Sequence, residues 1–177
     1  MVMLNYITLN LITIAGLKAM KSCFFIGHRE ADERLLPQLV STVERLVRVE
    51  NVTCFYVGRY GGFDRIAASA VKQVKKHHLE IQLMLVLHYH PAERAVEVPD
   101  GYDGTYYPKG LEKVPHQYAI VRVNKIMVET SDWLIAYVRH GASNSRKILE
   151  YAQRREKKGQ IHVLNLADVN EEGRDIK

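Results

Sequence analysis

Three short segments of this sequence combine glycine or another small residue with a cationic side chain. They are Gly27-His28-Arg29, residues 58–64 and residues 139–145. Glycine lets a backbone approach a ligand closely, and a helix that begins in such a loop presents unpaired N–H groups and its positive dipole end to an anion. The segments therefore predict a site for a phosphate-bearing ligand. None of them matches the G-x-G-x-x-G dinucleotide fingerprint or the Walker loop.

Each predicted site residue is assigned a role by its chemistry. Phosphates are expected on residues 58–62 and 141–145, with positive charge from Arg29 and Arg139. Asp64 is expected to contact ribose hydroxyls, Asn124 to orient the adjacent loop, and Tyr106 or Tyr107 to stack on a base. The predicted ligand-binding residues are Gly27, His28, Arg29, Gly58, Gly61, Gly62, Asp64, Asn124, Arg139, Gly141, Ser143, Asn144 and Ser145.

A purely structural interpretation of the same loops stays open. The Gly61-Gly62 pair is also suited to a tight turn between a strand and a helix, with Asp64 as an N-cap that accepts a backbone N–H. Residues 143–145 are equally suited to capping the last helix. What favours a ligand site is that three such loops, each with Arg or His, are predicted at one edge of a sheet.

Catalysis is the second interpretation of this site. Cleavage of an N-glycosidic bond requires a carboxylate that activates water or stabilises an oxocarbenium-like transition state. Asp64, with His28 as its acid/base partner, is the candidate catalytic pair. Glu150 is instead expected to be an exposed helix residue that pairs with Arg146 or Arg154.

The sequence predicts no metal site and no required cofactor. His88-x-His90 and His77-His78 are the closest approaches to a ligand set, but no cysteine or closely spaced carboxylate completes either of them. Cys23 and Cys54 lie in apolar runs and are expected to be buried strand residues, which fits a reducing cytoplasm.

Alternating hydrophobic patterns show how these loops would be brought together. Nearly continuous apolar runs predict strands at 22–26, 53–57, 81–87, 133–138 and 161–165, as in strands buried on both faces. Apolar residues at helical spacing separate them. The pattern predicts a doubly wound, Rossmann-like α/β fold: a mainly parallel five-stranded sheet with helices on both faces. In such sheets ligands bind outside the carboxyl ends of the strands, where all three loops are expected.

The segment 88–114 interrupts this alternation. It is long and rich in proline, glycine and tyrosine, and long loops inside compact domains are usually functional or mobile. It is interpreted either as a flap that closes over the carboxyl edge of the sheet or as a surface connection.

Composition limits the classes of protein that fit. The 177 residues are 47% hydrophobic and 25% charged, which is ordinary for one globular domain. The net charge of +5 falls short of a nucleic-acid signature. Six cations between residues 146 and 158 would be the feature of the sequence that contacts nucleic acid, if it binds any. A solvated helix face is favoured because no stacking aromatics alternate with these charges.

The first 19 residues are expected to lie outside the folded domain. Residues 1–14 are apolar but have no positive n-region and no cleavage site, and they are too short to cross a bilayer. The favoured interpretation is an extension upstream of a natural start at Met20, with an anchor or an extra strand as alternatives. Residues 20–177 then form a single domain.

A family resemblance is carried by residues 23–29, the glycine loop ending in Asp64, Tyr106-Tyr107-Pro108, Arg122, Asn124 and Ser131-Asp132. Together these motifs resemble the SLOG superfamily, and within it the YpsA-like branch of small Rossmann-like bacterial proteins. The resemblance covers residues 20 to about 166. Its relatives include phosphoribohydrolases of the LOG type and the DNA-processing protein A.

The resemblance implies roles for individual residues. Gly58, Gly62 and Asp64 match the superfamily's glycine-rich loop and would shape the floor of a ligand site, and residues 27–29 match its first loop. Where the superfamily usually has Gly-Thr at the start of the last helix, this chain has Asn144-Ser145. The hydrolases then carry a glutamate where this chain has Ile148, so the expected catalytic acid is missing.

These observations predict a cytoplasmic sensor or binding module for a nucleotide-derived, phosphate-bearing ligand, such as a nucleotide, NAD or an ADP-ribose-like molecule. A phosphoribohydrolase-like N-glycosidase is the first alternative, and a DNA-associated accessory factor is the second. No membrane partner is expected, and self-association into a homo-oligomer stays open.

Overall fold

A parallel sheet of six strands forms the centre of the fold. The structure is a computed structural model, and it describes residues 20–139 and 141–168; the predicted extension 1–19 lies outside the described residues. The strand order is β4-β3-β2-β1-β5-β6. The strands are β1 (Lys21–Gly27), β2 (Val52–Val57), β3 (Gln82–Val86), β4 (Gly104–Tyr106), β5 (Trp133–Tyr137) and β6 (His162–Asn165). The five predicted strands are confirmed, and β4 is an additional one.

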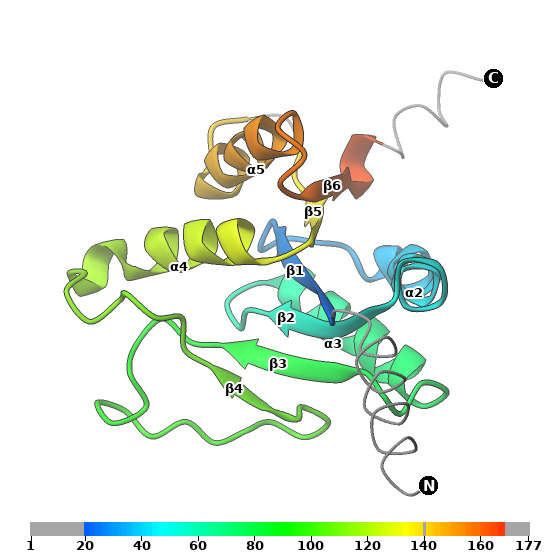
Figure 1. The fold of residues 1–177 in the computed structure, drawn as a ribbon, viewed down its shortest axis with the longest axis horizontal. Coiled ribbons are helices and arrows are strands. Elements are labelled where there is room, and N and C mark those ends of the chain that lie inside the picture. The colour runs from blue at the N-terminus through cyan, green and yellow to red at the C-terminus, as the bar shows by residue number, and fades with distance from the viewer. Residues whose placement is uncertain (1–19, 140, 169–177) are drawn as a thin grey trace, which may run out of the picture.

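Helices cover both faces of this sheet, as predicted (Figure 1). Alternate side chains of β1 point to opposite faces, so Cys23 and Phe25 join one buried cluster while Phe24 and Ile26 join the other. The first cluster is completed by α2 (Leu36–Arg45) and α3 (Gly62–Lys75), and the second by α4 (His116–Thr130) and α5 (Asn144–Glu156). The strands are therefore buried on both sides, which explains their continuous apolar sequences. A 3-10 turn (Glu33–Leu35) precedes α2, and a π-helical turn (Leu46–Glu50) follows it.

The winding direction of the chain reverses beside β1. From β1 the chain adds β2, β3 and β4 on one side, and α4 then returns it to β5 on the other side. In doubly wound folds, ligands bind at the carboxyl ends of the strands where this reversal occurs. Among the described residues, this rule places the expected ligand site between the loops that follow β1 and β5. No helix among these residues is long and apolar enough to cross a membrane.

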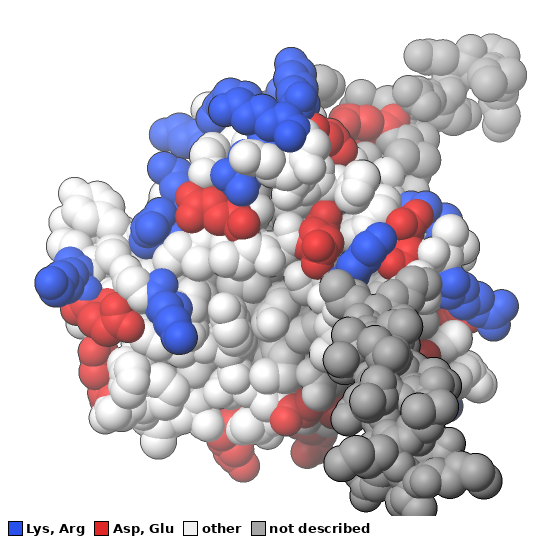
Figure 2. All heavy atoms as spheres, in the orientation of Figure 1, with Lys and Arg blue, Asp and Glu red and all other residues white. Residues whose placement is uncertain are grey.

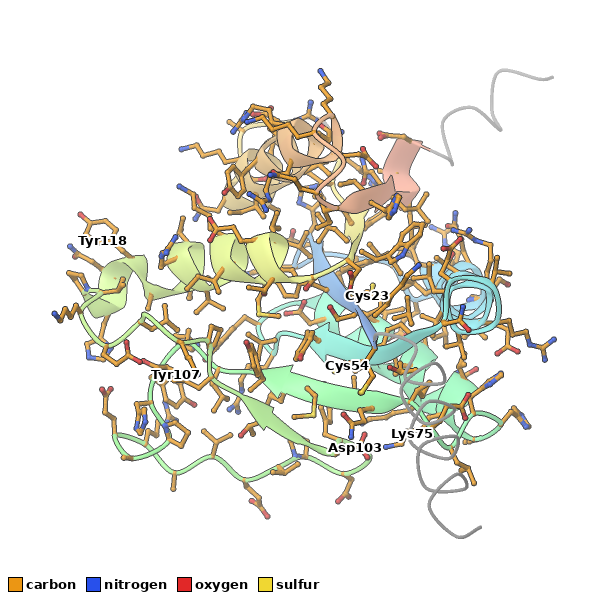
Figure 3. The ribbon with its side chains drawn as sticks, in the orientation of Figure 1. Cys23, Cys54, Lys75, Asp103, Tyr107 and Tyr118 are labelled. Atoms are coloured by element: carbon orange, nitrogen blue, oxygen red, sulfur yellow. The ribbon has the colours of Figure 1, made fainter. Side chains whose placement is uncertain are left out.

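Part of the segment predicted as a flap or surface connection is the edge strand β4. Asp103 aligns it with β3, because its N–H donates to the carbonyl of Leu83 (2.9 Å) and its carboxylate accepts from the Leu83 N–H (2.8 Å). The Asp103 carboxylate also forms an ion pair with Lys75 at the end of α3 (Figure 3). The prediction of five strands was one short because β4 has three half-buried residues and no apolar run of its own.

Asp132, which precedes β5, aligns that strand with its neighbours β1 and β6. Its carboxylate accepts from the Ser22 N–H (2.7 Å), and its carbonyl accepts from the His162 N–H (2.9 Å). The Ser131-Asp132 pair precedes β5, so it lies at the amino edge of the sheet, opposite the loops expected to bind ligand. Asp132, one residue of the SLOG resemblance, thus serves strand alignment here, whereas the Ser131 N–H donates to the Met127 carbonyl (3.0 Å) at the end of α4.

The two cysteines are buried, as predicted (Figure 3). Burial raises the pKa of both thiols, so neither is activated as a thiolate. Neither lines the cavity described below.

The end of β1 packs closely against the start of α3. A Cβ atom at Gly27 would lie 2.4 Å from the ring of Phe63, which is fully buried. Only glycine therefore allows the Phe63 ring to pack directly on the β1 backbone.

We expect Gly27→Ala to destabilise the protein by about 1 to 3 kcal/mol, the usual cost of overpacking. Gly104→Ala is the control, because its Cβ would meet only the flexible Met84 methyl group at 3.2 Å. Urea unfolding of both variants measures the difference. A smaller penalty for Gly27→Ala in a Phe63→Leu background would confirm the contact, and strictly additive effects would contradict it.

Candidate functional site

A cavity of about 510 Å³ opens at the carboxyl edge of the sheet. Its floor is formed by the ends of β1 and β3 and by the loops that follow β1 and β2. One wall is the first half of α4, including Gln117, Ile120 and Val121, and the start of α5 forms another. The cavity lies at the predicted position, and its size is in the range of small-molecule sites.

Ten of the thirteen predicted ligand-binding residues line this cavity. They are Gly27, His28, Arg29, Gly58, Gly61, Asp64, Asn124, Ser143, Asn144 and Ser145. Gly62, Arg139 and Gly141 are absent from the lining. The three loops chosen from the sequence are therefore adjacent, but not every residue in them faces the same space.

Two N–H groups at the start of α3 are hydrogen-bonded to the loop that follows β1. The Gly62 N–H donates to the carbonyl of Arg29 (2.8 Å), and the Phe63 N–H donates to the carbonyl of His28 (3.3 Å). The role of Gly62 is close packing, since a Cβ there would lie 2.5 Å from the Arg29 carbonyl oxygen. This helix start therefore does not offer these two donors to a phosphate, contrary to the expectation from the sequence.

Asp64 closes the loop between β2 and α3. Its carboxylate accepts the Tyr60 N–H (3.0 Å), and a Cβ at Gly58 would lie 2.8 Å from its Oδ2. Burial raises the pKa of Asp64, while hydrogen bonds from the Tyr60 and Gly61 N–H groups oppose that shift. Asp64 thus occupies the anion-binding position of its own loop. It does so from the first turn of α3, where Gly61 is the N-cap, so the prediction of Asp64 as the N-cap was wrong.

His28 connects the loops on the two sides of the winding reversal. Its Nε2 accepts the N–H of Arg139 (2.9 Å), and its own backbone N–H donates to the carbonyl of Tyr137 (3.2 Å). A neutral imidazole whose Nε2 accepts must carry its proton on Nδ1. One ring nitrogen of this candidate acid/base residue is therefore occupied by a structural hydrogen bond.

The two arginines predicted to bind phosphate have different surroundings. The Arg139 guanidinium donates a hydrogen bond to the Tyr137 hydroxyl, and its central carbon lies 5.3 Å from the centre of the Tyr137 ring. That contact holds it outside the cavity lining. Arg29 lines the cavity, is exposed, and has no hydrogen bond or ion pair to any described side chain. Arg29 is thus the cation available to a ligand.

The start of α5 is the helix terminus with available donors. Ser143 caps the helix through its hydroxyl, which accepts the Arg146 N–H (3.1 Å), and the Ser145 hydroxyl donates to the Gly27 carbonyl (3.3 Å). Within the described residues, the backbone N–H groups of Asn144 and Ser145 have no hydrogen-bond acceptor. Both residues line the cavity, so these donors and the helix dipole are placed to bind an anion there.

Two ring side chains at the cavity were missed from the sequence. The Tyr60 hydroxyl lies 3.3 Å from His88 Nε2, and the two rings meet edge to face at 4.9 Å. Burial first, and then the charge of Arg59, lower the pKa of His88. His88 follows β3 at the carboxyl edge. Its position just after a strand is the same criterion that selected the other loops, so it could have been found from the sequence.

The tyrosines predicted to stack on a base lie elsewhere. The Tyr106 ring packs on Tyr56 at 4.9 Å, and the Tyr107 ring packs on His90 at 5.2 Å. Neither tyrosine lines the cavity. Tyr106 is held in place as a residue of β4, which the sequence interpretation did not include.

The acidic groups of the site are few. Asp64 and Glu30 are the carboxylates among the lining residues, and Glu150 forms the predicted helix ion pair with Arg146 (3.0 Å) outside the cavity. The described residues contain no group of three or more His, Cys, Asp or Glu that could hold a metal ion.

Comparison with solved structures identifies proteins with a similar architecture. The molybdenum cofactor binding protein of the phototrophic bacterium Rippkaea orientalis superposes with a TM-score of 0.53 at 16% identity, covering 90% of this chain and 99% of that one. The Moco carrier protein of Chlamydomonas reinhardtii gives a TM-score of 0.49 at 11% identity, covering 88% and 96%. The first likeness shows the Rossmann-like α/β fold. No protein-family model and no curated protein matches the sequence.

The raised pKa of Asp64 predicts a pH-dependent difference between the wild type and Asp64→Asn. Because the folded protein binds this proton more tightly than the unfolded chain, ionisation costs folding free energy. As pH rises above about 3.8, the ordinary value, and through the raised folded pKa, the wild type loses stability relative to Asp64→Asn. At lower pH the difference is constant.

Urea unfolding between pH 3 and pH 7 measures this difference. Asp64→Ala is the control, since it loses the hydrogen bond from the Tyr60 N–H and is expected to cost about 1 kcal/mol at neutral pH. A wild type that gains stability over Asp64→Asn as pH rises would contradict the burial of this carboxylate.

Proposed function

We propose that this chain binds a small nucleotide-derived ligand through its phosphate in the cavity at the carboxyl edge. The observation that carries the proposal is the pairing of two unused cationic features, the start of α5 and the Arg29 guanidinium, at one cavity. A phosphate accepts hydrogen bonds from both backbone N–H groups and guanidinium groups.

The remaining lining suits the ring part of such a ligand. Ile120 and Val121 of α4 form an apolar wall, and Ile120 is 45% exposed although it belongs to the helix face next to the cavity. Tyr60, which is 46% exposed, supplies an aromatic side chain. The side chain of Asn124 has no hydrogen-bond partner among the described residues, so its amide group is available to a polar ring edge of a ligand.

These features support a binding module over an N-glycosidase. The candidate pair is engaged structurally, because Asp64 caps its loop and His28 accepts the Arg139 N–H. A general base needs a lone pair directed at water or substrate. The SLOG superfamily, whose members bind nucleotide-like ligands, stays a prediction from the sequence resemblance.

A pterin-derived ligand is a second candidate. The neighbour from Rippkaea orientalis is a molybdenum cofactor binding protein, and this cofactor is pterin-derived. Its ring system would use the same apolar wall as a nucleobase. We therefore include a pterin in the probe set.

Arg29→Ala is expected to weaken binding of AMP about tenfold or more, because a charge-assisted hydrogen bond contributes about 1.5 to 3 kcal/mol. Arg139→Ala is the matched control from the neighbouring loop and should change the affinity less than twofold. A thermal-shift screen with AMP, ADP-ribose, NAD and a pterin identifies the ligand class, and calorimetry measures the affinities.

The proposal would be contradicted if Arg29→Ala and Arg139→Ala lost affinity for AMP equally, or if no probe bound the wild type. The same AMP mixtures test the alternative enzyme. We expect no release of free adenine; release that Asp64→Ala abolishes would favour the N-glycosidase instead.

A further inference from the structure

A second hollow lies beside the cavity, between α4 and α5. It is a groove of about 300 Å³, and it shares two lining residues, Val121 and Asn144, with the cavity. The cavity and the groove therefore adjoin at the start of α5.

Cations from both helices line the groove. Lys125 comes from α4, while Lys147 and Arg154 come from α5, and none of the three forms an ion pair with a described residue. The one carboxylate in the lining, Glu150, accepts from Arg146 Nε (3.0 Å). Figure 2 shows Lys and Arg side chains gathered over α5. Within residues 20–139 and 141–168, the groove thus has three cations without an ion-pair partner.

The α5 residues of the groove follow one stripe along the helix. Asn144, Lys147 and Tyr151 are three and four positions apart, so they lie on the same face. The stripe begins at the helix start, where the cavity ends, and it leads to Arg154 one turn further on. The cations therefore extend the anion-binding end of α5 away from the cavity.

Tyr151 explains why the groove fits phosphate better than single-stranded nucleic acid. The Lys125 ammonium and the Arg154 guanidinium each lie 5.9 Å from the centre of its ring. The Tyr151 hydroxyl donates to Glu129 (2.8 Å). Nucleic-acid surfaces need an aromatic face on which bases stack, whereas this ring is surrounded by cations.

We propose that the groove is a second anion subsite for the ligand of the cavity, so that the ligand carries two separated phosphate groups. This inference rests on the proposed function. One phosphate binds at the start of α5 with Arg29, and the other binds Lys147 and Arg154 in the groove. The expected class is a nucleoside bisphosphate or a dinucleotide with a further phosphate.

The matched probes are AMP and adenosine 3′,5′-bisphosphate, which differ by one phosphate. Calorimetry on the full chain should show the bisphosphate binding at least tenfold more tightly than AMP. The double variant Lys147→Ala/Arg154→Ala should abolish that advantage and leave the affinity for AMP unchanged. Lys157→Ala/Lys158→Ala, just after the carboxyl end of α5 and outside the groove, is the control and should keep the advantage.

Each result distinguishes this inference from the proposed function. Equal affinities for the two probes in the wild type would overturn the second subsite and leave the cavity as the binding site. Loss of the advantage in both double variants would show a diffuse charge effect and also overturn it. If neither probe binds, the proposed function and the subsite fail together. Salt-dependent binding of an oligothymidylate that only the groove variant loses, without a bisphosphate advantage, would assign the groove to nucleic acid.

Discussion

The close approach of α3 to the end of β1 is the constraint on which the site depends. Gly27 and Gly62 make it possible, because a side chain at either position would collide with the Phe63 ring or with the Arg29 carbonyl. The ring of Phe63 then stacks on Tyr137 at 5.9 Å, so α3, β1 and β5 are packed together at the carboxyl edge. These contacts place the floor of the cavity and also consume donors that a phosphate would otherwise use.

The two helix starts at this edge are therefore not equivalent. At α3, carbonyl oxygens of the β1 loop accept two N–H groups, and the Asp64 carboxylate fills the adjoining loop. At α5, the N–H groups of two cavity-lining residues, Asn144 and Ser145, have no acceptor among the described residues. Since Asp64 already supplies negative charge on one side, an anionic ligand is attracted to the other side, where Arg29, the α5 dipole and the cationic groove lie.

Much of this arrangement was predictable, and the exceptions have physical causes. Strands buried on both faces give continuous apolar runs, so the five main strands and the loops at their carboxyl ends could be located from the sequence. The edge strand β4 could not, because Asp103 aligns it through contacts with residues far away in the sequence. Likewise, Arg29 and Arg139 follow strand ends in similar contexts, and only the hydroxyl and ring of Tyr137 decide that Arg139 lies outside the cavity.

The hydrogen bond between His28 and Arg139 bears on what kind of protein this is. It joins the loops after β1 and β5 through the protein's own groups, and the Ser145 hydroxyl adds a bond from α5 to the Gly27 carbonyl. A site held in this way spends little of its binding free energy on ordering loops. The same bonds occupy groups that catalysis would need in motion or in contact with substrate. A site whose potential acid/base groups are used to hold its own shape is better suited to retaining a ligand than to transforming it.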